Sequence, residues 1–157
     1  MKSSLILMLG LTSGLFFSQV PEEEAVKAAV NRLFMGMKNS DTESVKSSFT
    51  KTAILQTILK SGEVKTESIP WFIQTIGKAA KNSLNERISF SSIHIDGNLA
   101  SVWTPYQFYF NDTFSHCGVN SFQLIKEAGE WKIQYIIDTR RKDNCIAEAA
   151  AKNEIVK

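Results

Sequence analysis

Residues 116–141, HCGVNSFQLIKEAGEWKIQYIIDTRR, decide the fold because apolar and polar side chains alternate on both sides of a turn signal. The dipeptide Ala128-Gly129 lies in the middle, and a two-residue turn there predicts a β-hairpin. In that register Leu124 lies opposite Ile133. That register puts six apolar and aromatic side chains on one face of the hairpin, namely Phe122, Leu124, Trp131, Ile133, Tyr135 and Ile137.

The register decides which side chains point inward, because a shift of one residue exchanges the two faces of a strand. A three-residue loop would pair Leu124 with Gln134 and bury an amide, which is unfavourable, so the two-residue turn is preferred. Continued away from the turn along both strands, this register predicts an inner face that includes His116, Gly118, Asn120, Thr139 and Arg141. It also predicts that three side chains point outward, those of Cys117, Asp138 and Arg140.

The rest of the chain predicts helices before the main strands. An amphipathic helix follows Pro21, and Ser40 with Glu43 forms a capping box for a second, short helix. A hairpin turning at Ser61-Gly62 comes next, and a third helix begins at Ser68 and ends near Asn82. Three strands close the domain, at residues 87–95, 99–110 and 114–137, the last folded back on itself. Helices followed by an antiparallel meander indicate the α+β class.

Length, composition and charge indicate the number of domains and argue against nucleic-acid binding. The 157 residues, 43% hydrophobic and 22% charged, fit one globular domain. A net charge of +2 is too small to indicate nucleic-acid binding, and the only tight basic run, Arg140-Arg141-Lys142, is interpreted as a solvated face.

Residues 1–18 differ from the rest and predict a secretory signal peptide, with Lys2 followed by the apolar run from Leu5 to Phe17. Cleavage after Ser18 would leave a domain at 19–145 and a C-terminal tail at 146–157. An uncleaved membrane anchor is the alternative. The mature protein is then expected to be exported to the periplasm or the extracellular space, with no membrane span, in a compartment where disulfides persist.

Three segments resemble the nuclear transport factor two-like superfamily, which includes the SnoaL-like proteins: NSDTESVKSSFTKTAIL, GNLASVWTPYQFYF and the hairpin quoted above. The secreted lumazine-binding-like branch is the most similar. The resemblance covers roughly Glu22 to Cys145. It implies a cone-shaped, curved antiparallel sheet wrapped around N-terminal helices, a cystatin-like α+β roll. Members of the superfamily are enzymes, transporters or scaffolds, so the fold alone does not imply an activity.

The predicted inner face suggests a pocket for a small hydrophobic or aromatic ligand. Its expected lining is Trp71, Tyr106, His116, Asn120 and Tyr135. No cofactor is indicated. A metal site is not indicated either, because His94 and His116 lack ligand spacing around them.

Three functions remain open at this stage. The leading one is a noncatalytic small-molecule-binding or scaffold domain. The second is a proton-transfer enzyme of the cyclase, isomerase or dehydratase type, in which His116 moves the proton and Tyr106 donates a hydrogen bond to an oxyanion. His116 would then need an acid partner, and Asp138 is predicted to point away. The third is a protein-interaction module that uses the outer sheet face. A homodimer through that face is expected with the leading function, because Trp103 is predicted to point outward from its strand.

Cys117 and Cys145 have three possible states. An intrachain disulfide is the leading expectation, with free thiols and an interchain bond as alternatives. Cys117 is predicted to lie opposite Arg140, and Cys145 is five residues beyond Arg140 in the chain. The chain must therefore turn back at Asp143 and Asn144, which are turn-forming residues.

Overall fold

The computed structural model describes residues 19–145, with the side chains of residues 19 and 20 left out. The predicted signal peptide at 1–18 and tail at 146–157 lie outside these residues. The elements in chain order are α1 (Gln19–Asn39), α2 (Thr42–Ser48), β1 (Phe49–Ile58), β2 (Val64–Glu67), α3 (Ile69–Lys78), β3 (Leu84–Ile88), β4 (Ser92–Asp96), β5 (Leu99–Phe110), β6 (Thr113–Glu127) and β7 (Glu130–Arg141). None of the described helices is both long enough and apolar enough to cross a membrane.

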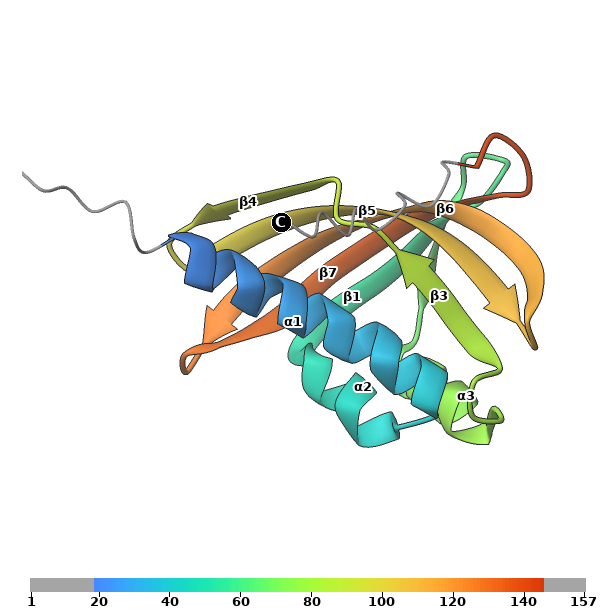
Figure 1. Ribbon diagram of the computed structural model, residues 1–157, viewed down its shortest axis with the longest axis horizontal. Coiled ribbons are helices and arrows are strands. Elements are labelled where there is room, and N and C mark those ends of the chain that lie inside the picture. Colours follow the sequence, from blue (N-terminus) through green and yellow to red (C-terminus); the bar gives the residue numbers. More distant parts are fainter. Residues whose placement is uncertain (1–18, 146–157) are drawn as a thin grey trace, which may run out of the picture.

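The strands form one curved, open sheet in the order β2-β1-β7-β6-β5-β3, and β4 pairs with the same edge of β5 as β3 does. The predicted α+β class with a curved sheet around N-terminal helices is confirmed. The sheet is mixed, however, because β1 pairs with β7 in parallel while the other pairs are antiparallel. Helix α1 crosses the concave side of the sheet, and α2 and α3 lie together at one end (Figure 1).

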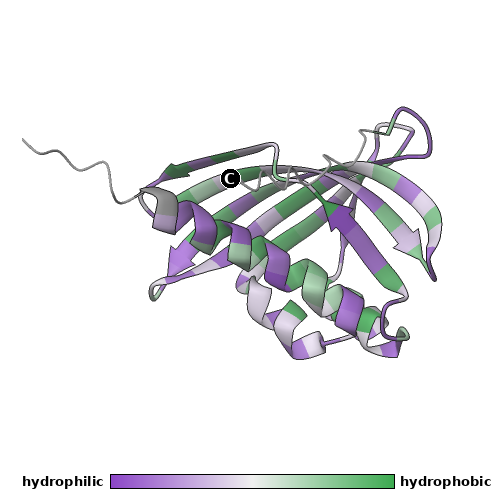
Figure 2. Ribbon diagram, in the orientation of Figure 1, coloured by the Kyte–Doolittle hydropathy of each residue, from purple (hydrophilic) through white to green (hydrophobic). Residues whose placement is uncertain are grey.

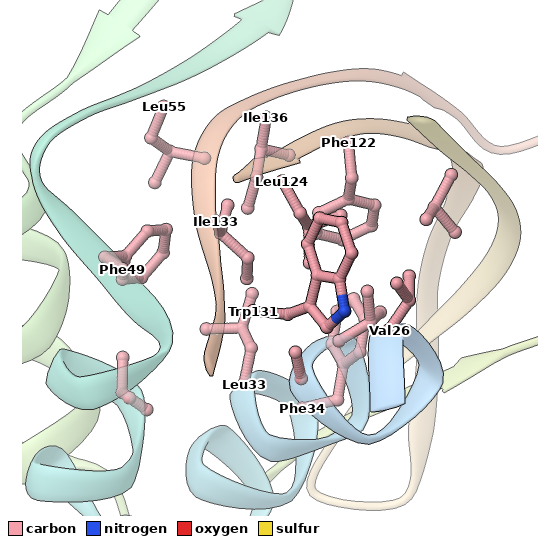
Figure 3. Close-up of a cluster of buried hydrophobic side chains, with 14 of the residues drawn as sticks. Val26, Leu33, Phe34, Phe49, Leu55, Phe122, Leu124, Trp131, Ile133 and Ile136 are labelled. Carbon is pink, nitrogen blue, oxygen red and sulfur yellow. The ribbon is translucent and has the colours of Figure 1, made fainter. Parts of the chain in front are cut away.

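The hydrophobic core lies between α1 and the concave face of β5, β6 and β7. Hydrophobic and hydrophilic bands alternate along α1, as an amphipathic helix requires (Figure 2). The rings of Phe34 and Phe122 meet edge to face, with centroids 6.0 Å apart. Figure 3 shows the side chains that fill this space, among them Val26, Leu33, Phe34, Phe122, Leu124, Trp131 and Ile133.

The helix ends follow local capping rules, with two departures from the predicted bounds. Asp41, and not Ser40, caps α2, since its carboxylate accepts the Ser44 backbone N–H at 3.0 Å. Ser40 instead adopts a left-handed backbone conformation with φ 56°, which ends α1. Ser68 caps α3 as predicted, but the helix ends at Lys78, four residues before Asn82.

The predicted strand 87–95 is two strands, β3 and β4, separated by an irregularity beside β5. Ile88 pairs with Tyr106 and Ser92 pairs with Trp103, so residues 89–91 stand opposite only two residues of β5. One of those two is Pro105, which has no N–H to donate to the ladder. Pro105 on the neighbouring strand therefore accounts for the interruption.

A second irregularity lies in the β6–β7 hairpin and changes the functional face. The predicted pairing holds from the turn at Ala128-Gly129 to Leu124 and Ile133. Beyond that point Gln134 is an extra residue, so Gln123 pairs with Tyr135. The amide of Gln134 bonds to β1, accepting from the Thr50 hydroxyl at 2.7 Å and donating to a backbone carbonyl.

Because of this bulge, the predicted inner and outer faces of β7 are wrong beyond Gln134. From Tyr135 onward the inward and outward positions exchange, so Asp138 and Arg140 lie with the inner residues Asn120 and Gly118. Asp138 is 6% exposed, not an outward-pointing surface residue. The residues that take outer positions are Tyr135, Ile137, Thr139 and Arg141. The β6 faces are as predicted, because the extra residue is on the other strand.

Candidate functional site

A cavity of about 420 Å³ lies inside the curve of the sheet. Its apolar wall comes from the C-terminal half of α1, from α3 and from the inner faces of the strands, through Leu33, Met37, Phe72, Ile76, Phe122 and Ile136. Trp71 on α3 borders the same cavity and is 56% exposed. Lys65 and Glu67 of β2 also border it, and their side chains pair at 2.7 Å.

The structure places four of the five predicted pocket residues at this cavity: Trp71, Tyr106, His116 and Asn120. Tyr135 lies elsewhere. Its hydroxyl donates to Gln56 Oε1 at 2.7 Å, on the other face of the sheet, because the bulge at Gln134 reverses its side. Ile136 takes the inward position in its place.

Asp138 is the centre of a buried hydrogen-bond network at the polar part of the cavity. Its carboxylate accepts from the Thr57 hydroxyl, from Arg140 Nε at 2.9 Å and from the Tyr106 hydroxyl at 3.2 Å. Arg140 also donates to Thr57 Oγ1 at 2.9 Å. Three donors, one of them a guanidinium, satisfy this carboxylate, so Asp138 holds β1, β5 and β7 together.

Tyr106 is fixed by the same network. Its hydroxyl donates to the carbonyl of Thr139 at 2.9 Å, in addition to its longer contact with Asp138. Burial, followed by the negative charges of Glu86 and Asp138, raises the pKa of Tyr106. The phenol stays protonated, and its proton points to β7.

Glu86 on β3 is the site residue that sequence analysis missed. It points inward opposite Phe108 and accepts a hydrogen bond from the Asn120 amide at 2.8 Å. The side chain keeps some exposed surface because it lines the cavity, but protein atoms surround its carboxyl group. Burial, reinforced by the negative charge of Asp138, raises the pKa of Glu86 to about 7. The signal was the alternation within Leu84–Ile88, but the strand was predicted to begin one residue after Glu86.

The raised pKa predicts a pH-dependent cost of folding at Glu86. Between the unfolded value of 4.5 and the folded value of about 7, the folded chain holds this proton more tightly, so stability falls as pH rises. We expect Glu86→Gln to be more stable than the parent at pH 8, by up to about 3 kcal/mol, and to lose that advantage near pH 5. Urea unfolding of both proteins at the two pH values measures it. A stability difference that does not change with pH would contradict the assignment.

His116 packs between aromatic rings and does not bond to an acid within residues 19–145. Its ring centroid lies 5.1 Å from that of Phe108 and 5.7 Å from that of Tyr106. Its Nδ1 lies 3.0 Å from the Ser115 hydroxyl. Burial, followed by the positive charge of Arg140, lowers the pKa of His116. The imidazole is thus neutral at pH 7, and the bulge brings Asp138 to the inner face without making it a hydrogen-bond partner of His116.

The two cysteines form an intrachain disulfide, Cys117–Cys145, with Cα atoms 5.7 Å apart. The predicted reversal of the chain is present, because Asn144 has a left-handed backbone and its carbonyl accepts from Arg141 Nε at 3.1 Å. Cys117 lies opposite Arg141, one residue from the predicted partner, again because of the bulge. The disulfide lies on the outer face and closes the end of the hairpin beside the polar part of the cavity.

The sequence profile of a family described as "Putative lumazine-binding" matches residues 21–135. The chain belongs to this family. The matched range runs from the start of α1 into β7 and ends before Ile136, Asp138 and Arg140, the β7 residues that line the cavity. The lumazine-binding-like assignment agrees with the resemblance given by the sequence. No curated protein matches the chain significantly.

Solved structures confirm the fold of this lumazine-binding-like chain. A nuclear transport factor two-like protein of unknown function from Silicibacter pomeroyi DSS-3 has a TM-score of 0.65 at 18% identity, over 80% of this chain and all of the other. A second such protein, from Shewanella baltica OS155, has a TM-score of 0.64 at 18% identity over 79% and 97%. A domain with a cystatin-like fold from Nostoc punctiforme PCC 73102 has 0.62 at 16% identity over 77% and 78%. At these identities the likeness establishes the fold alone.

Proposed function

We propose that this chain is an exported, noncatalytic protein that binds a small hydrophobic or aromatic molecule in the cavity inside the sheet. The composition of the cavity carries the proposal, because its walls are mainly apolar and a few polar side chains gather at one part of them. Ligand sites usually have this composition, and a volume of about 420 Å³ lies within their usual range. The family description points in the same direction.

The bordering residues divide into two groups by chemistry. Trp71, exposed beside the cavity, offers an aromatic surface against which a flat ligand can pack. His116, Asn120 and Glu86 offer polar atoms to the same space. A ligand with one apolar end and one polar end would satisfy both groups, and its orientation would be set by the polar end.

Two further parts of the proposal rest on the outer surface. The disulfide supports export, because disulfides persist in oxidising compartments. Leu99 and Trp103 have outer positions on β5 and are 48% and 47% exposed. Exposed apolar side chains of this size support a homodimer or another protein interface on the outer face.

A proton-transfer enzyme is the second candidate, and the raised pKa of Glu86 is the observation that favours it. A carboxyl group that titrates near pH 7 in an apolar cavity can act as a general base. Glu86, not His116, is then the residue to assign that role. The binding proposal stays ahead of it because Tyr106, the expected oxyanion donor, already bonds to Thr139 and Asp138.

Native mass spectrometry of the protein purified from an exported fraction tests the leading proposal. We expect a retained small molecule, a mature mass that lacks residues 1–18, and a dimer. Thr75 borders the cavity on α3, so Thr75→Trp should narrow it and reduce the retained ligand at least about 10-fold. The neighbouring exposed residue Gln74 provides the matched control, Gln74→Trp, which should retain the ligand.

The same measurement can contradict the proposal in two ways. Equal ligand retention by Thr75→Trp and Gln74→Trp would place the ligand outside the cavity. A protein that arrives without ligand and fails to bind added lumazine and other small aromatic probes would exclude the binding function.

A further inference from the structure

Three carboxylates border the cavity, and two of them, Asp138 and Glu86, differ in how their hydrogen-bonding capacity is used. Asp138 accepts from three donors, Thr57, Tyr106 and Arg140. Glu86 accepts a hydrogen bond from one, the Asn120 amide on Oε1. A carboxylate can accept about four hydrogen bonds, and each bond stabilises a carboxylate that is largely shielded from water. Glu86 therefore has capacity to bind another donor that enters the cavity.

The carboxylates around the cavity also differ in whether they have an ion-pair partner. Asp138 is paired with Arg140 at 2.9 Å, and Glu67 is paired with Lys65 at 2.7 Å. Within residues 19–145, Glu86 has no cationic side chain within ion-pair distance. An unpaired carboxylate in a mainly apolar cavity is costly when ionised. A cation or a strong N–H donor on the ligand would remove that cost.

Glu86 is also held in position. It extends inward from β3, in register with Phe108 on β5, and the amide that anchors it belongs to Asn120 on β6. Asn120 is itself 6% exposed and pairs with Asp138 in the β6–β7 ladder. Three strands thus fix the carboxyl group against the apolar wall, so a ligand does not need to order it.

We propose that Glu86 anchors the ligand by accepting N–H hydrogen bonds from a protonated amine or a comparable nitrogen cation attached to an aromatic ring system. The ring occupies the apolar part of the cavity between α1, α3 and the sheet. This inference rests on the proposed binding function and names the chemical class of its ligand.

The charged groups facing Glu86 make the anchoring pH-dependent. Asp138 and Arg140 of β7 offset each other, Tyr106 of β5 stays protonated, and His116 of β6 is neutral at pH 7. Lys65 and Glu67 of β2 pair with each other. Glu86, with a pKa of about 7, then gains negative charge as the pH rises from 7 to 8, where His116 is already neutral. Affinity for an amine that stays protonated throughout should rise across this range.

Calorimetric titration with three naphthalene probes tests the inference: 1-naphthylmethylamine, 1-naphthalenemethanol and 1-naphthoic acid. They share the ring and differ in the charge of one group. We expect the parent protein at pH 8 to bind the amine at least about 10-fold more tightly than the alcohol, because hydrogen bonds between charged groups are the strong ones. Glu86→Gln should bind both equally. Glu63→Gln, an exposed residue in the β1–β2 turn, is the matched control and should keep the preference.

Any other result contradicts the role of Glu86. The pattern across the three probes also shows whether the proposed binding function fails with it. Equal affinity for all three probes, or an amine preference that survives Glu86→Gln, overturns the role of Glu86 and leaves the cavity as a binding site. Tighter binding of 1-naphthoic acid overturns it in favour of Arg140 as the anchor. Failure of all three probes to bind contradicts the inference and the proposed function together.

Discussion

Replacing Gly118 with alanine is expected to destabilise the protein by at least about 3 kcal/mol, the upper range for overpacking a buried site. A Cβ atom at Gly118 would overlap the carbonyl oxygen of Thr139 and lie 2.8 Å from Tyr106 Cε1. Both neighbours are fixed, because the Tyr106 hydroxyl donates to that carbonyl at 2.9 Å. The extra methyl group must therefore displace backbone, not the end of a flexible side chain.

The local structure explains why only glycine fits. Val119 pairs with Thr139 in the β6–β7 ladder, and the Val119 backbone N–H bonds to the Thr139 side-chain hydroxyl at 3.3 Å. The Thr139 carbonyl meets the hydroxyl of Tyr106, whose ring passes over Gly118. A side chain at position 118 would separate these partners and disturb the network around Asp138.

Urea unfolding measures the effect, with Gly62→Ala as the matched control. Gly62 lies in the β1–β2 turn with φ 87°, and an added Cβ there would meet nothing within 4 Å. Its replacement costs only the left-handed backbone, about 1 kcal/mol. A Gly118→Ala variant no less stable than Gly62→Ala would contradict the packing argument, whereas one that fails to fold exceeds the expected loss.

Loss of the Cys117–Cys145 disulfide is expected to cost about 3–4 kcal/mol. The bond joins residues 28 positions apart, and the loop-closure entropy it removes from the unfolded chain gives this magnitude. Cys145→Ser is the variant to use, because Cys117 is fully buried and its replacement would add a packing defect. The measurement is the free energy of unfolding in urea, without reductant.

A reductant supplies the internal control for the disulfide. The parent protein in dithiothreitol should lose the same free energy as Cys145→Ser, and Cys145→Ser itself should not respond. A loss below about 1 kcal/mol in the variant would mean that the bond does not constrain the unfolded chain. Because the disulfide closes the hairpin beside Arg140, ligand retention in the reduced protein also reports whether the cavity depends on it.

The sequence predicted the α+β class, the family resemblance, the Ala128-Gly129 turn and four of the five cavity residues. These follow from local patterns, because alternation and turn chemistry depend on neighbours in the chain. It did not predict the parallel pairing of β1 with β7, which joins segments about eighty residues apart. The break between β3 and β4 was missed as well, since its cause is Pro105 on another strand.

The candidate site shows most clearly which features follow from the sequence and which depend on the tertiary structure. Inward positions on β5 and β6, including Tyr106, His116 and Asn120, follow from strand periodicity and a recognisable turn, so the sequence was sufficient for them. The inward positions of β7 depend on one extra residue at Gln134, whose amide bonds to β1 across the sheet. The Ile136-Ile137 pair gives no preference between the two faces, so burial could not reveal the shift. Only the packed sheet turned Asp138 inward, where it pairs with Arg140, and left Glu86 as the cavity carboxylate without an ion-pair partner among residues 19–145.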